Sequence, residues 1–184
     1  MGADKSGTEF TLAAWHRDDE RLVGEADLAY THLHPTAFMQ NLLGRARDVR
    51  ERHLLTDPID GAAVSFVDAR DVAADAATVL TESGHEGTAY PVTGPEALTY
   101  EEMAAALSAA LDHEVECVTV GLDQVRVSME EMGMPAPLVD GVVGLQRWFE
   151  DGNGAAVEPT VEEVTGRPAR TFEEFVADYR EALA

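Results

Sequence analysis

Along this chain, short runs of apolar residues alternate with longer segments in which apolar residues recur at helical spacing. The short runs predict strands at residues 28–33, at the start of 62–83, at 87–94 and at 114–120. The longer segments predict helices at 12–25, at the end of 35–51, at the end of 62–83, and at 98–111, 122–133, 137–152 and 171–183. Strands and helices that alternate in this way indicate an α/β fold.

Polar residues at two helix starts support these boundaries. Thr99 and Glu102 have the spacing of a capping box, in which each side chain satisfies a backbone N–H group of the first turn. Asp68 or Asp71 is a plausible N-cap for the helix within 62–83, since a carboxylate can accept hydrogen bonds from unpaired N–H groups.

The stretch THLHPTAFMQNLLG, residues 31–44, is typical of a strand that ends at a ligand cleft. Pro35 stops the strand, and polar side chains then lie among bulky apolar ones: Thr36, Gln40 and Asn41 beside Phe38 and Met39. Strand ends that mix apolar bulk with a few amides are common at the clefts of α/β proteins. The sequence therefore predicts a small-molecule site here.

Length and composition bound the class of protein. The chain has 184 residues, of which 45% are apolar, which suits one globular domain. It contains no apolar run of about 18 residues, the length that a membrane-spanning helix needs. The first ten residues, MGADKSGTEF, lack the apolar core of a signal peptide, so we expect a cytoplasmic protein.

Charge narrows the choice of partners. Asp and Glu number 35 against 13 Lys and Arg, which gives a net charge of −22. So negative a surface argues against binding to nucleic acids or anionic membranes. Acid-rich, lysine-poor surfaces are used by halophiles, and we expect a high-salt cytoplasm, with an ordinary acidic protein as the alternative. Cys117 is the single cysteine, so no disulfide forms within the chain.

Motifs that identify a metal or nucleotide site are scarce. The chain has no G-x-G-x-x-G and no P-loop, and the GNG at 152–154 is a weak match. His32 and His34 alternate around Leu33, so their side chains share one face of the strand. They could form a metal pair, but no carboxylate has a fitting spacing, and we expect core or surface histidines and no metal.

Four blocks of the sequence resemble the NmrA-like branch of the atypical short-chain dehydrogenase/reductases. They are LAYTHLHPTAFMQNLLG, VSFVDARDVAADAATVL, YPVTGPEALTYEEMAAALSAAL and EVTGRPARTFEEFVADYR, in family order. The family includes NAD(P)H-dependent quinone and azo-compound reductases and also NAD(P)-sensing regulators without catalytic activity. The resemblance implies a partial NAD(P)-binding Rossmann-like fold with a C-terminal substrate subdomain.

The resemblance covers only the later part of the family's fold. Residues 1–184 resemble a single truncated domain, in which 1–80 end a Rossmann half and 81–184 form the substrate subdomain. The first strands and the glycine loop that holds the cofactor's phosphates precede the matching region in the family. We therefore expect the chain alone to bind NAD(P)H weakly or not at all.

The resemblance also assigns roles around the cleft. Four residues border the nicotinamide of NAD(P)H: Pro35, Thr36, Ala37 and Phe38. Three face the substrate: Phe38, Met39 and Asn41.

On the preceding helix, isoflavone-reductase-like relatives carry a proton-donating Lys, and its position here corresponds to His16. The alternative for His16 is a histidine on the helix surface. The family's usual residue before the Pro is Arg, which is replaced here by His34.

The resemblance implies an oxidoreductase that transfers hydride from NAD(P)H to a quinone-like small molecule, with impaired activity in this chain. Two alternatives stay open. One is a non-catalytic NAD(P)-sensing or regulatory module. The other is a remnant binding module, from a truncated gene, a misassigned start or one half of a split protein. Without the family's earlier strands, the strand at 28–33 has an exposed edge, so we also expect a homodimer or a partner chain there.

Overall fold

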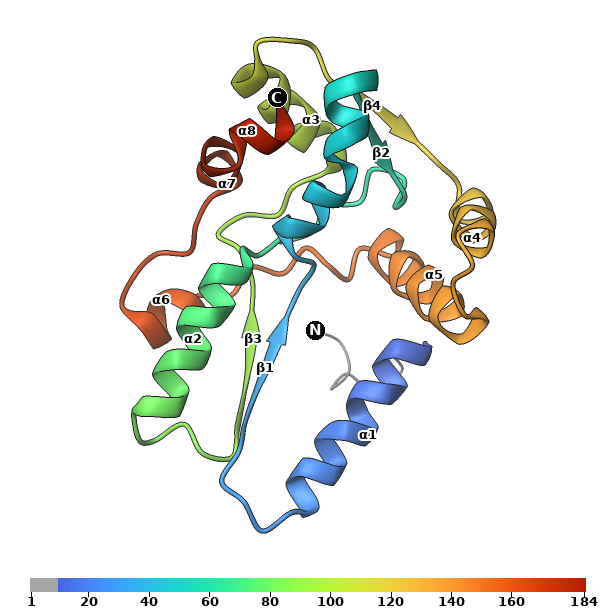
Figure 1. The fold of residues 1–184 in the computed structure, drawn as a ribbon. Helices are drawn as coiled ribbons and strands as arrows, with labels where there is room; N and C mark the ends of the chain where they lie inside the picture. The colour runs from blue at the N-terminus through green and yellow to red at the C-terminus, as the bar shows by residue number, and fades with distance from the viewer. Residues whose placement is uncertain (1–9) are drawn as a thin grey trace.

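Two pairs of parallel strands organise the structure, a computed structural model that describes residues 10–184 (Figure 1). β1 (Thr31–Pro35) pairs with β3 (Thr88–Val92), and β2 (Leu54–Asp57) pairs with β4 (Glu116–Thr119). Helices lie on the chain between paired strands, as parallel pairing requires. The predicted α/β fold is confirmed. Residues 1–9, on which the expectation about a signal peptide rests, lie outside the described residues.

The helices lie around these strand pairs (Figure 1). They are α1 (Thr11–Glu25), α2 (Ala69–Thr81), α3 (Tyr100–Leu111), α4 (Leu122–Glu131), α5 (Ala136–Glu150), α6 (Thr160–Thr165), α7 (Phe172–Asp178) and α8 (Arg180–Leu183). α2 packs on β1 and α6 on β3, while α3 packs on β2 and β4. α1 and α4 each pack against α5. Within residues 10–184, no helix is long and apolar enough to span a membrane.

The predicted strand at the start of 62–83 is wrong. The segment is buried and extended but makes only single bridges, Val64 with Leu98 and Phe38 with Val67. Its backbone N–H groups donate to different loops: the Val67 N–H donates to the Ala37 carbonyl, and the Ser65 N–H donates to the Gly154 carbonyl. The segment therefore crosses between loops and does not run along one strand.

Two predicted helices also differ in detail. The helix expected within 35–51 begins at Met39 with 3-10 geometry as far as Arg45 and ends with a π turn over Asp48–Arg52. His53 then takes a left-handed conformation, with φ of 55°, which ends it. The helix expected at 171–183 is interrupted at Tyr179, which separates α7 from α8.

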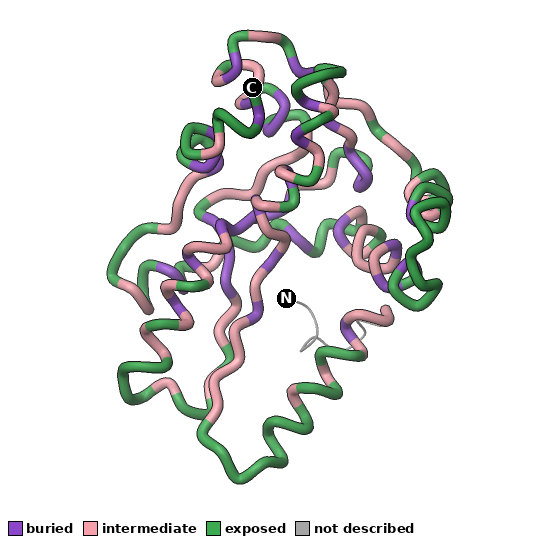
Figure 2. Tube along the Cα trace, viewed as in Figure 1, coloured by how far each residue is buried: buried purple, intermediate pink, exposed green. Residues whose placement is uncertain are grey.

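The hydrophobic core has one large cluster and smaller ones. Figure 2 marks where buried residues occur along the chain. The large cluster joins α3, β2, α7, α8 and the helical segment Met39–Arg52, and its most buried members include Met39, Leu55, Leu107, Phe172 and Phe175. A second cluster under α2 and α6 contains Val67, Val92 and Val161. α1 buries only Ala13 among its residues, so it is the least embedded long helix.

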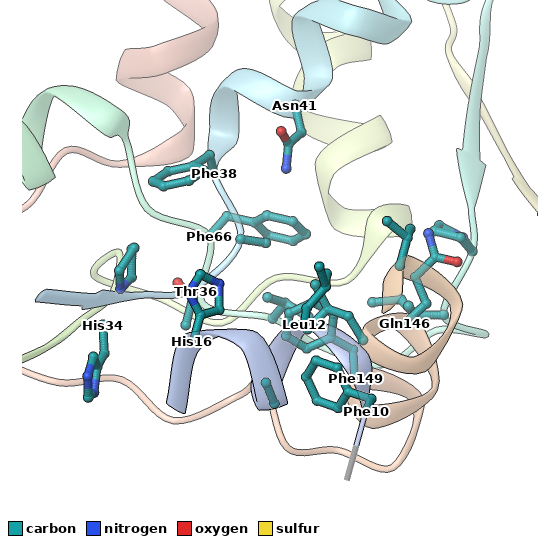
Figure 3. Close-up of a pocket in the computed structure, with 18 of the residues that line it drawn as sticks. Phe10, Leu12, His16, His34, Thr36, Phe38, Asn41, Phe66, Gln146 and Phe149 are labelled. Atoms are coloured by element: carbon teal, nitrogen blue, oxygen red, sulfur yellow. The ribbon is translucent and has the colours of Figure 1, made fainter. Parts of the chain in front are cut away.

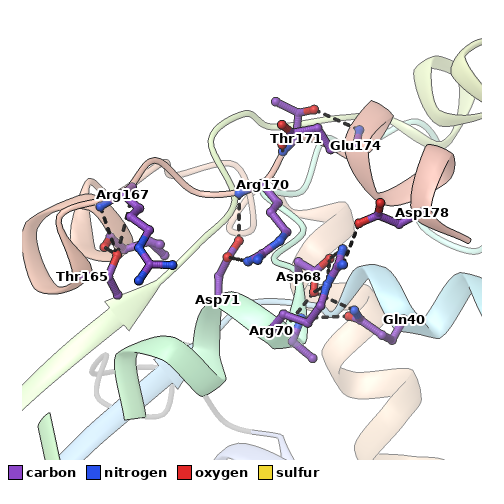
Figure 4. Close-up of polar contacts among 12 residues, drawn as sticks. Gln40, Asp68, Arg70, Asp71, Thr165, Arg167, Arg170, Thr171, Glu174 and Asp178 are labelled. Carbon is purple, nitrogen blue, oxygen red and sulfur yellow. Dashed lines mark hydrogen bonds and ion pairs between the residues drawn. The ribbon is translucent and has the colours of Figure 1, made fainter. Parts of the chain in front are cut away.

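Ion pairs fix α2 to the C-terminal segment (Figure 4). Asp68 is the N-cap, as predicted, and its carboxylate accepts from the Arg70 backbone N–H at 2.8 Å and from the Arg70 guanidinium at 2.6 Å. Arg70 also reaches Asp178 on α7 at 2.6 Å. Asp71, the other candidate cap, accepts instead from the Arg170 backbone at 2.8 Å and from the Arg170 side chain.

β1 pairs on one edge only, because within residues 10–184 no other strand lies beside its opposite edge. His32 and His34 share one face of β1, as predicted, with ring centroids 6.2 Å apart. Both strand pairs join residues before position 80 to residues after it, and the division of the domain at that position stays a prediction.

Candidate active site

A cavity of about 690 Å³ lies between α1, the end of β1, the helical segment Met39–Arg52 and α5 (Figure 3). The cavity lies at the carboxyl end of β1, the usual place for ligands in α/β proteins. Most of its lining is apolar, and the aromatic side chains are Phe10, Phe38, Phe66, Tyr100 and Phe149.

The loop predicted to border nicotinamide forms one wall. Pro35, Thr36, Ala37 and Phe38 all line the cavity. The Thr36 backbone N–H donates to the Val92 carbonyl at 3.0 Å, and the Thr36 hydroxyl donates to the Ser65 carbonyl. The Ala37 carbonyl accepts from the Val67 N–H at 2.9 Å. These bonds attach the loop to the end of β3 and to the segment 65–67.

The residues predicted to face substrate divide into two groups. Phe38 and Asn41 line the cavity. Met39 does not, because it starts the 3-10 helix with its side chain in the large core cluster, where it is 1% exposed. Met39 borders only a small void of about 20 Å³ behind the wall. Its position therefore gives the predicted substrate contact no support.

His16 lies on α1 and lines the cavity from the side opposite the loop (Figure 3). The residue is exposed overall, so its imidazole meets both solvent and the cavity. In Figure 3 the ring projects from α1 toward the loop that contains Thr36. The structure thus brings His16 to the same cavity as the predicted nicotinamide loop.

His34 joins β1 to α1 at the rim of the cavity. Its Nε2 lies 2.8 Å from Glu20 Oε1, and the histidine side chain is almost fully buried. The contact lacks the alignment of a hydrogen bond, so it acts as an ion pair when the imidazole is protonated. Where the family usually has Arg, this chain keeps a group that can still meet a carboxylate.

Sequence reasoning missed a polar group of residues on the wall formed by α3, α5 and the helical segment. Arg45 lies over the Tyr100 ring, with Cζ 5.3 Å from the centroid, and both line the cavity. Burial raises the pKa of the Tyr100 hydroxyl, although the Arg45 charge acts in the opposite direction. Gln146 also lines the cavity, and its Oε1 is buried without a hydrogen-bond partner.

A weak signal for these residues was present. Tyr100 follows the capping Thr99 inside one of the family-like blocks, which places it at the first position of α3. Arg45 belongs to the charged run RARDVRE, which resembles an ordinary solvated helix face. Among residues 10–184, no group of three or more His, Cys, Asp or Glu side chains is arranged to hold a metal ion.

Comparison with known proteins gives close relatives although no family model matches the chain. A NAD(P)H azoreductase from Xenophilus azovorans is 44% identical over 172 residues, which are 94% of this chain and 60% of the relative. The (4-alkanoyl-5-oxo-2,5-dihydrofuran-3-yl)methyl phosphate reductase of Streptomyces griseus is 35% identical over 184 residues, which are 100% of this chain and 65% of the relative.

A solved structure shares the fold. The crystal structure of a NADPH-dependent quinone oxidoreductase from Escherichia coli, complexed with NADPH, matches with a TM-score of 0.85 at 24% identity. The match covers 98% of this chain and 63% of that protein. The chain thus spans 60% and 65% of the length of the two sequence relatives.

Proposed function

Because the chain belongs to the NmrA-like family, we propose that it carries the substrate side of a site for NAD(P)H-dependent reduction of quinone-like or azo molecules. The observation that carries this proposal is the cavity of about 690 Å³ at the end of β1, bordered by Pro35–Phe38. Ligand cavities span about 300–1,000 Å³ and have mainly apolar walls. Phe38, Phe66 and Phe149 provide flat apolar surfaces for a planar ring.

Each end of the cofactor has a different fit to this chain. The apolar loop 35–38, held by bonds to Val92, Ser65 and Val67, suits the nicotinamide end. The 184 residues contain no glycine-rich loop for the pyrophosphate. We therefore propose that the chain alone binds dinucleotide weakly. The second candidate function is a non-catalytic binding or regulatory module that retains the substrate cavity.

The chain's own residues bind and orient the acceptor and supply a proton. NAD(P)H, when bound, supplies the hydride. Reduction of a quinone to a hydroquinone needs one hydride and one proton, and His16 is the group we propose as the proton donor. Phe38 and Asn41 hold the acceptor against the loop, and α1 limits the access of water to it.

The experiment is calorimetry of the chain with menadione and, separately, with NADPH. We expect menadione to bind and NADPH to show no micromolar affinity. Phe38→Ser is expected to weaken menadione binding about tenfold through lost ring contact. Leu80→Ser, at a side chain that is 83% exposed and outside the cavity, is the control. Absence of menadione binding would overturn the site, and micromolar NADPH affinity would overturn the predicted weakness.

The proton role of His16 needs a rate measurement. With NADPH in large excess, His16→Gln is expected to slow menadione reduction by a factor on the order of 10² and to remove the pH dependence due to that imidazole. His85→Gln is the control, because His85 does not line the cavity. An unchanged rate in His16→Gln contradicts the role, and no turnover in any variant supports the non-catalytic candidate.

We also propose that the protein works in a cytoplasm of high salt. The support is compositional: a net charge of −22 with Lys5 as the single lysine. Salt screens repulsion between surface charges beyond about 8 Å at physiological strength and about 3 Å at 1 M.

A further inference from the structure

A partly buried arginine without a carboxylate partner lines the cavity. Arg45 is only partly exposed, yet within residues 10–184 no Asp or Glu forms an ion pair with it. Other partly buried arginines are paired, for example Arg70 with Asp68 and Arg170 with Asp71. In a chain with 35 acidic and 13 basic residues, a guanidinium without a carboxylate partner at a cavity wall is unexpected.

Protein contacts hold this guanidinium in place without neutralising it. Arg45 Nη1 donates to the Thr56 carbonyl and to Thr56 Oγ1, the latter at 3.2 Å. The guanidinium also lies against the Tyr100 ring, 5.3 Å from its centroid. The bonds to Thr56 use Nη1 alone, and a hydrogen bond from the guanidinium to the Tyr100 hydroxyl acts to lower the pKa of that hydroxyl; neither partner carries a negative charge that would neutralise Arg45.

The neighbouring acids are already engaged. Asp57, next to Thr56, accepts from the Ile59 N–H at 2.8 Å and from the Gly61 N–H at 2.6 Å. Among the described residues that line the cavity, Glu20 is the one carboxylate, and it contacts His34. Arg45 is the one Arg or Lys in that lining. The cavity lining therefore contains one positive side chain with which no carboxylate of that lining pairs.

We propose that Arg45 receives an acidic group of the substrate, so that the preferred acceptors are aromatic molecules that bear a carboxylate, sulfonate or phosphate. This inference rests on the proposed function, since it concerns the same cavity. A guanidinium binds such groups through paired N–H donors, and its charge is worth more inside a partly desolvated cavity than in water. The amide of Asn41, which also lines the cavity, adds further donors.

The charge of the whole molecule opposes this selectivity and makes it testable. At low salt, a net charge of −22 repels any anion at long range. Salt at about 1 M shortens that repulsion to roughly 3 Å, whereas a partly buried contact is screened much less. A preference for anionic ligands that persists at high salt is therefore the mark of a local contact such as the one with Arg45.

The test compares two ligands of one ring system, neutral menadione and naphthoquinone sulfonate, by calorimetry in about 1 M salt. We expect the wild-type chain to bind the sulfonate at least about tenfold more tightly, as a charged hydrogen-bonded contact allows. Arg45→Gln should bring the two affinities together while menadione affinity stays within about twofold. Arg47→Gln is the matched control, since it removes the same charge from an 81% exposed side chain of the same helical segment.

A second variant covers the case in which Arg45→Gln fails to fold. Asn41→Asp adds a carboxylate to the same lining and leaves the contacts of Arg45 with Thr56 and Tyr100 in place. We expect it to remove the sulfonate preference.

The outcomes separate this inference from the proposed function. Equal binding of the two ligands by the wild-type chain, or a preference that survives Arg45→Gln (or Asn41→Asp, where Arg45→Gln does not fold), overturns the role of Arg45 and leaves the proposed function intact. If neither ligand binds, the proposed function itself fails.

Discussion

Two aspartates on one side of α2 show how a hydrogen-bond partner decides the state of a buried carboxyl group. Asp68 and Asp75 are both fully buried. Burial by itself would raise the pKa of Asp68, but hydrogen bonds from Arg70 and Gln40 outweigh it, and the net pKa is lowered. Asp75 has no hydrogen-bond partner, so burial, with the charge of Asp71, raises its pKa to about 6.

The substitution Asp75→Asn is expected to stabilise the fold at neutral pH. The pKa of Asp75 is about 6 in the folded state against an ordinary value of 3.8, so its ionisation opposes folding. The stability of the protonated form is fully present below the ordinary value and is lost as pH rises through the folded value. A shift of this size is worth at most about 3 kcal/mol, and we expect a gain of about 1–2 kcal/mol at about pH 7.5.

Urea unfolding at about pH 5 and about pH 7.5 checks this, because the gain should be clearly smaller at the lower pH. Asp68→Asn is the control on the same helix. It removes a paired carboxylate whose pKa is lowered, so it should destabilise the protein at both pH values. A gain from Asp75→Asn that is equal at both pH values would exclude ionisation as the cause.

At the level of elements, three segments meet behind the wall of the cavity. The end of β1 bonds to the extended segment 64–67, and the turn after β3 passes directly over that segment. Gly94 N–H points to the Ser65 carbonyl at 3.4 Å, and a Cβ atom on Gly94 would lie 1.9 Å from the Phe66 carbonyl oxygen. This approach of one backbone to another sets the position of Phe66 in the cavity wall.

The substitution Gly94→Ala is therefore expected to destabilise the fold by more than about 3 kcal/mol, since backbone atoms have to move to admit the methyl group. Gly44→Ala is the matched control. A Cβ there meets nothing within 4 Å, and the helical position gains up to about 1 kcal/mol from alanine. Denaturant unfolding of both variants measures the difference, and equal stabilities would contradict the close approach.

Elements that depend on local sequence were predictable. The capping box of Thr99 and Glu102 and the cap at Asp68 formed as expected, because each acts within one helical turn. The strand expected at the start of 62–83 failed, because its backbone groups bond to several separate loops, at Ala37, Leu98 and Gly154, and not to one neighbouring strand. No local pattern reports such contacts.

The same distinction holds for the site. A proline after a strand marks the loop 35–38, which does line the cavity. Arg45 and Tyr100 meet there only through tertiary packing, and no spacing along the chain relates them. Met39 lies in the same stretch and its apolar side chain suits a substrate contact. However, the geometry of the helix start turns that side chain into the core.

At the scale of the whole molecule, the net charge and the edge of β1 both affect whether copies of the chain associate. A net charge of −22 keeps copies apart and strains the compact state. Within residues 10–184, no strand pairs with the second edge of β1, and such an edge is a template on which another chain can pair. Salt weakens the repulsion, so both folding and pairing should respond to it.

We expect the melting temperature to rise between about 0.1 M and about 2 M salt, and dimers to form through β1 as repulsion is screened. Thermal scans and light scattering at the same salt concentrations check the two parts separately. Sucrose in place of salt is the control for a general effect on the compact state. A stable monomer at both salt concentrations would contradict pairing at the edge, and a constant melting temperature would favour the ordinary acidic protein.

The order of strand pairing limits how this chain can be divided. β1 pairs with β3 and β2 with β4, so the spans that close the two pairs interlock between Leu54 and Val92. A protease nick between β2 and β3 would separate the partners of both pairs at once, and each fragment would hold one strand of each pair. Such fragments could restore either pair only by complementing each other, because the two pairings share the segment between Leu54 and Val92.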